Sequence, residues 1–219
     1  MLPTFKTSIN QIREKITNIG ESLVKSNILI LEALQTCDAQ KFSEARNSIK
    51  NITAKADEID NTIIKILALY TPEARDLRQV VAYFKITNEL SRACSNTRSF
   101  IRGFTDVCSD LDVKEINEYA TLMQASTVKA VDTTVKMINI DDTDELQEMY
   151  EEVLIEENKV DDLYEMIERK LVEEAEGSRT FEKYHKMLRA LRKSEKIASR
   201  AISVANLLVY IKIGGTIHN

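Results

Sequence analysis

Residues that break helices are almost absent from this chain, and their scarcity limits its fold more than any other feature. Among its 219 residues there are 5 glycines and 2 prolines. Folds built from strands and tight turns need such residues at most of their corners, whereas long helices do not. The sequence therefore predicts a chain that is mostly α-helical.

Apolar side chains recur at steps of three and four residues, which is the period of an amphipathic helix. Asp38 and Asp142 are placed to open helices, Pro72 suits a first helical turn, and Gly177 is placed to end a helix. These signals divide the chain into six helices, which we expect at about residues 5–36, 38–71, 72–103, 114–139, 141–176 and 178–213.

The order of these helices repeats with a period of about 100 residues. Asp60 and Asp161, for example, hold matching places in the second helix of each half. Long helices with short connections favour antiparallel, up-and-down packing. We therefore predict an all-α fold of two tandem, pseudo-symmetric three-helix bundles, formed by residues 1–106 and 110–219.

Five segments carry a resemblance to a known family: DEID at 57–60, ARDLR at 74–78, FKITNELSR at 84–92, VDDLY at 160–164 and LRKSEKIAS at 191–199. Their order and spacing resemble those of the PhoU family over nearly the whole chain. The resemblance implies a cytoplasmic, non-enzymatic adaptor that negatively regulates phosphate uptake and phosphate-starvation signalling. Its implied partners are the ATPase of a phosphate ABC transporter and a sensor histidine kinase, and the resemblance also allows a homodimer.

Three charged residues in the first turns of the third predicted helix are candidates for partner binding: Arg75, Asp76 and Arg78. The helix dipole favours an acidic residue such as Asp76 at this end. The two arginines could reach a partner, or they could join neighbouring carboxylates in a salt-bridge cluster that fixes the turn. Both interpretations stay open.

Two charged stripes follow helical spacing in the second half of the chain. The cationic stripe lies on the last predicted helix and contains Lys186, Arg189, Lys193 and Lys196. The acidic stripe lies on the helix before it and contains Glu145, Glu148, Glu152 and Glu156. The stripes could face each other or be solvated, or one of them could dock a partner surface of opposite charge.

Carboxylates at matching places in the two halves are the weak candidates for a metal site, because oxygen ligands favour hard cations such as Mg²⁺. Members of the PhoU family use Glu-xxx-Asp pairs to hold multinuclear metal clusters. At the corresponding positions this chain has Ser91, Ser95, Glu195 and Ser199. We therefore expect no tightly bound cofactor, and at most weak divalent-cation binding near Asp57, Asp60, Asp161 or Glu195.

The three cysteines, Cys37, Cys94 and Cys108, lack CxxC spacing and a neighbouring histidine, so no zinc or redox motif is recognisable. We expect free thiols, with Cys94 buried as a small apolar residue.

Composition and motifs also limit the class of function. A net charge of −5 gives no overall cationic field and argues against a nucleic-acid partner. No apolar run approaches a membrane span, and no nucleophile–base pair or phosphate-binding loop indicates an enzyme. Two alternatives remain: an accessory protein of another type of phosphate transporter, or a metal-binding helical-bundle enzyme. The second would need another Glu-xx-His beside Glu182 and His185.

Overall fold

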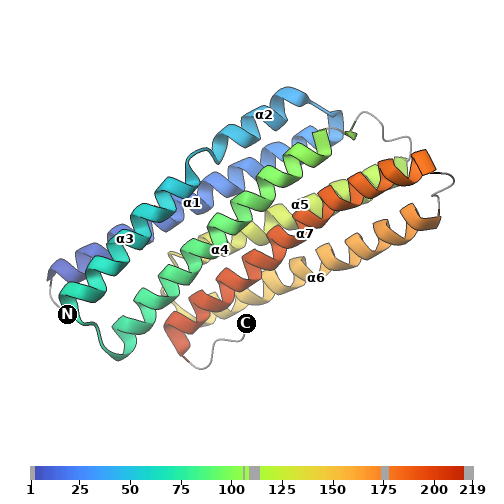
Figure 1. Cartoon of the computed structure of the whole chain (residues 1–219). Coiled ribbons are helices and arrows are strands. Elements are labelled where there is room, and N and C mark those ends of the chain that lie inside the picture. The colour runs from blue at the N-terminus through green and yellow to red at the C-terminus, as the bar shows by residue number, and fades with distance from the viewer. Residues whose placement is uncertain (1–2, 106, 109–113, 174–177, 215–219) are drawn as a thin grey trace.

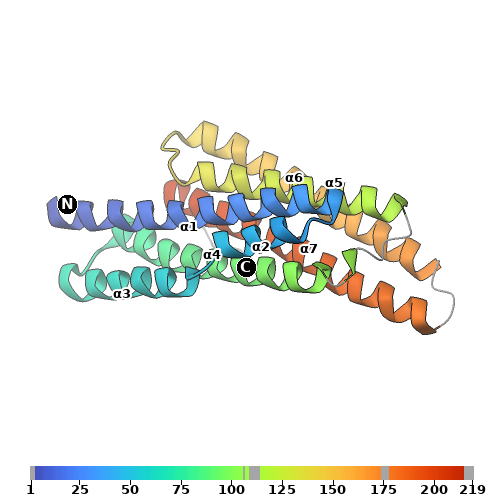
Figure 2. The same ribbon diagram turned by 90° about the horizontal axis from the view of Figure 1, so that it is seen from above.

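A computed structural model of the chain describes residues 3–105, 107–108, 114–173 and 178–214. These residues form helices and no strand: α1 (Pro3–Thr36), α2 (Ala39–Ser48), α3 (Ile52–Tyr70), α4 (Ala74–Thr105), α5 (Lys114–Met137), α6 (Thr143–Glu173) and α7 (Ser178–Ile213). The helices lie lengthwise in an elongated molecule, with α4 and α7 side by side (Figures 1 and 2). The all-α fold of two bundles, α1–α4 and α5–α7, is confirmed. No helix in the described ranges is apolar over a stretch long enough to cross a bilayer.

The aspartates predicted to open helices do so at matching points of the two halves. Asp38 accepts hydrogen bonds from the backbone N–H groups two and three residues further on, at 2.8 and 3.3 Å. Asp142 makes the same two contacts at 3.0 and 2.9 Å. Each carboxylate thus satisfies N–H groups that the first helical turn leaves without partners. The stop predicted at Gly177 lies outside the described residues.

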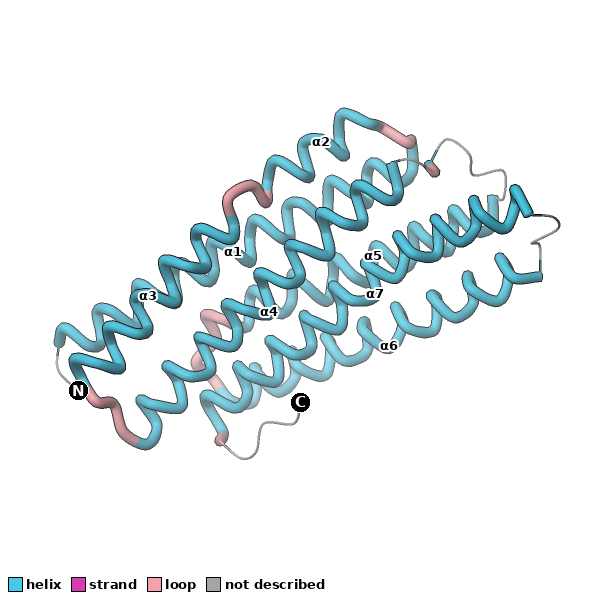
Figure 3. Tube along the Cα trace, viewed as in Figure 1, coloured by secondary structure: helices cyan, strands magenta, loops and turns pink. Residues whose placement is uncertain are grey.

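The second predicted helix is divided into α2 and α3 by a short break (Figure 3). Asn51 has a φ of 65°, in the left-handed region that asparagine tolerates better than most residues. Ile49 and Ile52 flank the break and are both fully buried. The apolar period continues across the break, and for this reason periodicity alone predicted one helix.

Two hydrophobic cores follow one another along the molecule, and each contains residues from both halves of the chain. One core includes Phe5, Ile59 and Leu90 together with Val204. The other includes Phe104 with Leu171 and further residues of α1, α2, α5 and α7. The bundles are therefore packed into each other through shared cores. Residues 106 and 109–113, at the boundary of the two predicted repeats, are not described, and the superposition of the repeats stays a prediction.

A buried polar network joins α1, α5 and α7 near the middle of the molecule. The Gln124 side-chain amide donates a hydrogen bond to Asn27 Oδ1 at 3.0 Å. The Ser194 hydroxyl donates to Gln124 Oε1 at 2.8 Å and lies 3.1 Å from the Thr127 hydroxyl. All four side chains are buried, so their mutual hydrogen bonds offset the loss of water.

The prediction of three free thiols is wrong for two of them. Cys37, just after α1, and Cys108, after α4, form a disulfide with their Cα atoms 5.7 Å apart. The fold brings together two cysteines that are 71 residues apart, and no local spacing signals such a pair. Cys94 is free and buried, as predicted, and burial raises the pKa of its thiol to about 12.

Candidate functional site

The three charged residues at the start of α4 have different surroundings. Arg75 is exposed, while Asp76 and Arg78 are half-buried. The guanidinium of Arg78 lies over the Tyr210 ring of α7, 5.7 Å from its centroid, and its Nε is buried without a hydrogen-bond partner. Arg78 therefore holds the start of α4 against the end of α7, whereas Arg75 is the residue of this group that is open to a partner.

In the first half, the carboxylates Asp57 and Asp60 lie on α3, and Asp57 is exposed. One carboxylate oxygen of Asp60 is buried without a hydrogen-bond partner. Burial raises the pKa of Asp60, and repulsion from the Asp57 carboxylate raises it further. These two residues are brought together, but no described cation neutralises Asp60.

In the second half, the structure brings Asp161 of α6 and Glu195 of α7 close enough to interact. Burial, followed by the Glu195 charge, raises the pKa of Asp161. Glu157 belongs to the same group, because burial and then the charges of Asp161 and Glu195 raise its pKa. Sequence reasoning missed Glu157, although it precedes Asp161 by one helical turn and so shares its face of α6.

Glu195 itself is only 4% exposed, and its carboxylate already has partners within its own helix. Lys196 Nζ and the Ser199 hydroxyl contact Oε1 at 3.1 and 3.2 Å. Arg192 Nε lies 3.2 Å from Oε2 as an ion pair, although Oε2 accepts no hydrogen bond. In the described part of the chain, no group of three or more His, Cys, Asp or Glu side chains is placed to hold a metal ion. The residues present therefore do not fit a multinuclear cluster at this position.

The cationic stripe of α7 does not face the acidic stripe of α6. Lys186, Arg189 and Lys193 line a groove of about 420 Å³ together with Arg102 and neighbouring residues of α4. Lys196, the fourth predicted member, turns instead toward Glu195. Three of the four stripe residues thus lie on a surface shared with α4, which sequence spacing on a single helix cannot reveal.

The most buried residue of the acidic stripe on α6 is Glu156, and lysines outside the cationic stripe neutralise it. Glu156 accepts hydrogen bonds from Lys129 of α5 at 2.8 Å and from Lys159 at 2.9 Å. Burial alone would raise the pKa of Glu156, but these hydrogen bonds outweigh it and lower the pKa. No ion pair among the described residues joins the two stripes.

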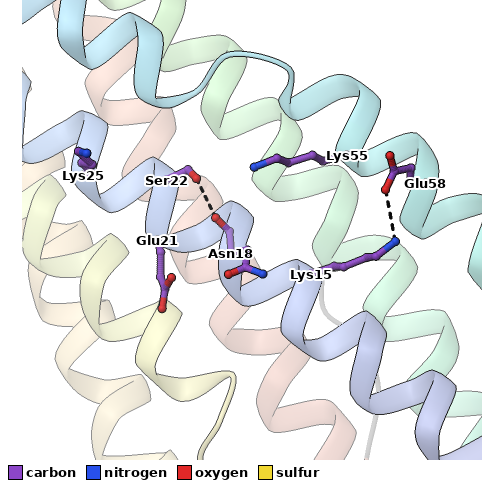
Figure 4. Close-up of a pocket in the computed structure, with 7 residues that line it drawn as sticks. All are labelled: Lys15, Asn18, Glu21, Ser22, Lys25, Lys55 and Glu58. Carbon is purple, nitrogen blue, oxygen red and sulfur yellow. Dashed lines mark hydrogen bonds and ion pairs between the residues drawn. The ribbon is translucent and has the colours of Figure 1, made fainter.

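A polar groove of about 460 Å³ lies between α1 and α3 (Figure 4). Lys15 and Glu58 point toward each other across it, with 3.3 Å between Nζ and Oε2. Its other charged residues are Glu21, Lys25 and Lys55, so its charges are nearly balanced. Its lining contains none of the candidate site residues predicted from the sequence, and we do not assign it a function.

The Glu-xx-His motif at the start of α7, which consists of Glu182 and His185, also has ordinary contacts. Glu182 pairs with Lys186 at 2.9 Å, and the His185 ring stacks on Phe181 with centroids 6.1 Å apart. His218, the other histidine, lies outside the described residues. These contacts explain both residues without a metal.

Solved structures of known proteins share this architecture. The crystal structure of the phosphate transport system regulatory protein PhoU from Streptococcus pneumoniae matches with a TM-score of 0.82 at 15% identity, covering 98% of this chain and 99% of that one. PhoU from Pseudomonas aeruginosa has a TM-score of 0.76 at 23% identity, covering 96% of this chain and all of that one (100%). No curated protein sequence matches. At these identities the likeness establishes the fold.

The chain is thus an all-α protein of tandem helical bundles, with the fold of solved PhoU structures along almost its whole length. The family model described as the PhoU domain matches residues 16–100. This match lies within α1–α4 and contains the DEID, ARDLR and FKITNELSR segments. The resemblance to the PhoU family is therefore confirmed.

Proposed function

We propose that this protein is a cytoplasmic, non-enzymatic adaptor that negatively regulates phosphate uptake and phosphate-starvation signalling. It couples the ATPase of a phosphate ABC transporter to a sensor histidine kinase. The observation that carries the proposal is the PhoU domain at residues 16–100, within a fold that matches a phosphate transport regulatory protein over 98% of this chain.

The described surface is consistent with an adaptor. Three of its grooves lie on the outside of helix pairs, and their linings are charged and amphipathic. Such surfaces bind other proteins by charge and shape complementarity and need no reactive group. An adaptor of this kind would act by bringing partners together or holding them apart.

The decisive experiment is deletion of the gene in the source organism, with a phosphate-starvation promoter fused to a reporter. We expect the reporter to become active under ample phosphate and to be silenced again when the wild-type gene is restored. Unchanged reporter output in the deletion strain would refute the regulatory role. Pull-down of the tagged protein from phosphate-rich and phosphate-poor cultures then identifies which type of phosphate transporter it accompanies.

Point variants make this experiment sharper. Arg75→Ala should give part of the deletion phenotype without loss of stability, because Arg75 is exposed and has no described partner. Arg78→Ala is the less specific variant, since Arg78 also packs on Tyr210 and would loosen the contact between α4 and α7. Melting curves of both purified variants separate lost binding from lost stability.

A further inference from the structure

The outer face of the α4–α7 pair carries two grooves that follow one another along the helices, and we call them together the α4–α7 groove. One stretch, of about 580 Å³, lies between Phe84–Arg92 of α4 and Arg200–Leu207 of α7. The other stretch, of about 420 Å³, lies between Ser99–Gly103 and Lys186–Lys193. The two helices are adjacent and antiparallel, as Figure 1 shows.

The two stretches lie on one face of α4. Lys85, Asn88, Arg92, Ser99 and Arg102 line them at steps of three, four, seven and three residues, which return to the same side of a helix. With a rise of about 1.5 Å per residue, Lys85 and Arg102 are about 26 Å apart along the axis. The two grooves together therefore span a length that about five turns of another helix would cover.

The groove has an excess of positive charge. Five lining cations have no ion-pair partner among the described residues: Lys85, Arg92, Arg102, Arg189 and Lys193. Its lining includes one acidic residue, Glu89, which is paired with Arg200 at 2.8 Å. In a chain with a net charge of −5, this local excess is a distinct cationic surface.

An exposed apolar strip leads into the groove from the start of α4. Leu77, Val81 and Phe84 are 40%, 37% and 41% exposed, and they follow helical steps of four and three residues. The same face of α4 is thus apolar at its beginning and cationic toward its end. An inorganic anion would make no use of the apolar part, and a flat membrane surface does not fit a groove between two helices.

We propose that the α4–α7 groove docks an acidic, amphipathic helix of a partner protein. Apolar side chains of that helix would cover Leu77, Val81 and Phe84, and its carboxylates would pair with the unpartnered cations further along. Helices commonly dock in grooves of this kind through anchors spaced by three and four residues. The inference rests on the proposed adaptor function and names the surface and the chemistry of one partner.

The test uses a synthetic, fluorescently labelled helical peptide of five to six turns, about 20 residues. Leucines occupy one face at one end of the peptide, and glutamates continue that face to the other end. A second peptide with lysine in place of each glutamate is its control. Fluorescence anisotropy with the full-length protein should show binding of the acidic peptide that weakens with added salt, because salt screens exposed charges. The lysine peptide should not bind.

Two matched double variants locate the binding site. Arg102→Glu/Lys193→Glu reverses two charges in the groove and should weaken binding about tenfold or more. Lys25→Glu/Lys55→Glu makes the same change in charge in the α1–α3 groove and should leave binding unchanged. Phe84→Ala, at the apolar end, should weaken binding about threefold while leaving its salt dependence as it is.

The proposal is overturned if the acidic peptide does not bind, or if both double variants weaken binding equally. It is also overturned if inorganic phosphate or anionic phospholipid vesicles bind at Arg102 and Lys193 while the peptide does not. Failure here is distinct from failure of the proposed function, which the deletion reporter tests. A derepressed reporter with no peptide binding would leave the adaptor role intact and exclude this surface.

Discussion

Gly20 of α1 lies close to Val135 of α5, in the other half of the chain, and Gly20→Ala tests the packing between the two halves. A Cβ atom at this position would lie 2.6 Å from Cγ2 and 3.0 Å from Cγ1 of Val135 on α5. Both distances are shorter than van der Waals contact. Val135 is buried and its side chain is short and β-branched, so it cannot turn aside as a long flexible side chain could.

Two effects of opposite sign set the expected magnitude. Alanine is favoured over glycine within a helix by about 1 kcal/mol. Overpacking a closely packed core costs about 1–3 kcal/mol. The cost of the clash should exceed the gain in helix propensity, so we expect Gly20→Ala to lower the free energy of unfolding by about 1 kcal/mol. In a Val135→Ala background the clash is removed, and Gly20→Ala should then raise the free energy of unfolding by about 1 kcal/mol.

Chemical denaturation of the four proteins in this double-mutant cycle measures both values, and the denaturant slope shows whether each protein unfolds in two states. Gly103→Ala is the milder comparison, because its Cβ would meet Ala190 at 3.3 Å, a tight contact that a small shift relieves. The cost of this contact and the gain in helix propensity of about 1 kcal/mol should nearly cancel. If Gly20→Ala is equally stabilising with and without Val135, the close contact between α1 and α5 does not exist as described.

Further predictions concern the buried network around Gln124, the carboxylates around Asp161, the disulfide and the metal content of the purified protein. Asn27→Ala removes a partner of Gln124 and should cost about 1–3 kcal/mol in chemical denaturation. The raised pKa of Asp161 means that its ionised form opposes folding, so stability falls as pH rises from the ordinary to the raised pKa. Asp161→Asn should therefore raise the melting temperature at neutral pH, and the gain should vanish below about pH 4. Reduction of the Cys37–Cys108 disulfide should destabilise the protein by up to about 4 kcal/mol, while Cys37→Ser/Cys108→Ser should not respond to reductant. Protein purified without chelator should contain no multinuclear complement of iron or zinc, and EDTA should leave its melting temperature unchanged.

The parts of the fold that follow local rules could be predicted from the sequence. A helix start depends on a few neighbouring atoms, so Asp38 and Asp142 could be identified as the residues that open the second helix of each half. The amphipathic period likewise indicated the helices themselves, but it did not separate buried from exposed apolar residues: on α4, Leu90 is buried whereas Leu77 and Phe84 are exposed. These features depend on residues within one or two helical turns.

Features that depend on contacts between distant helices could not be predicted in this way. The sequence located Lys186, Arg189 and Lys193 on one stripe, but only the packing of α4 against α7 places Arg102 beside them. The Cys37–Cys108 disulfide is of the same kind, as is the network around Gln124, whose members are far apart in sequence. The break at Asn51 is local, yet it preserves the apolar period that predicted a continuous helix.

The packing between α4 and α7 also connects the fold to the proposed docking surface. Arg78 of α4 stacks on Tyr210 of α7 at one end, and Gly103 lies close to Ala190 at the other. Between them, Arg200 pairs with Glu89. The two helices are therefore in contact at both ends and in the middle. Because α4 belongs to the first bundle and α7 to the second, the groove between them exists only when both bundles are in place. A partner helix in this groove would therefore contact both halves at once, and any shift of one bundle against the other would change its affinity.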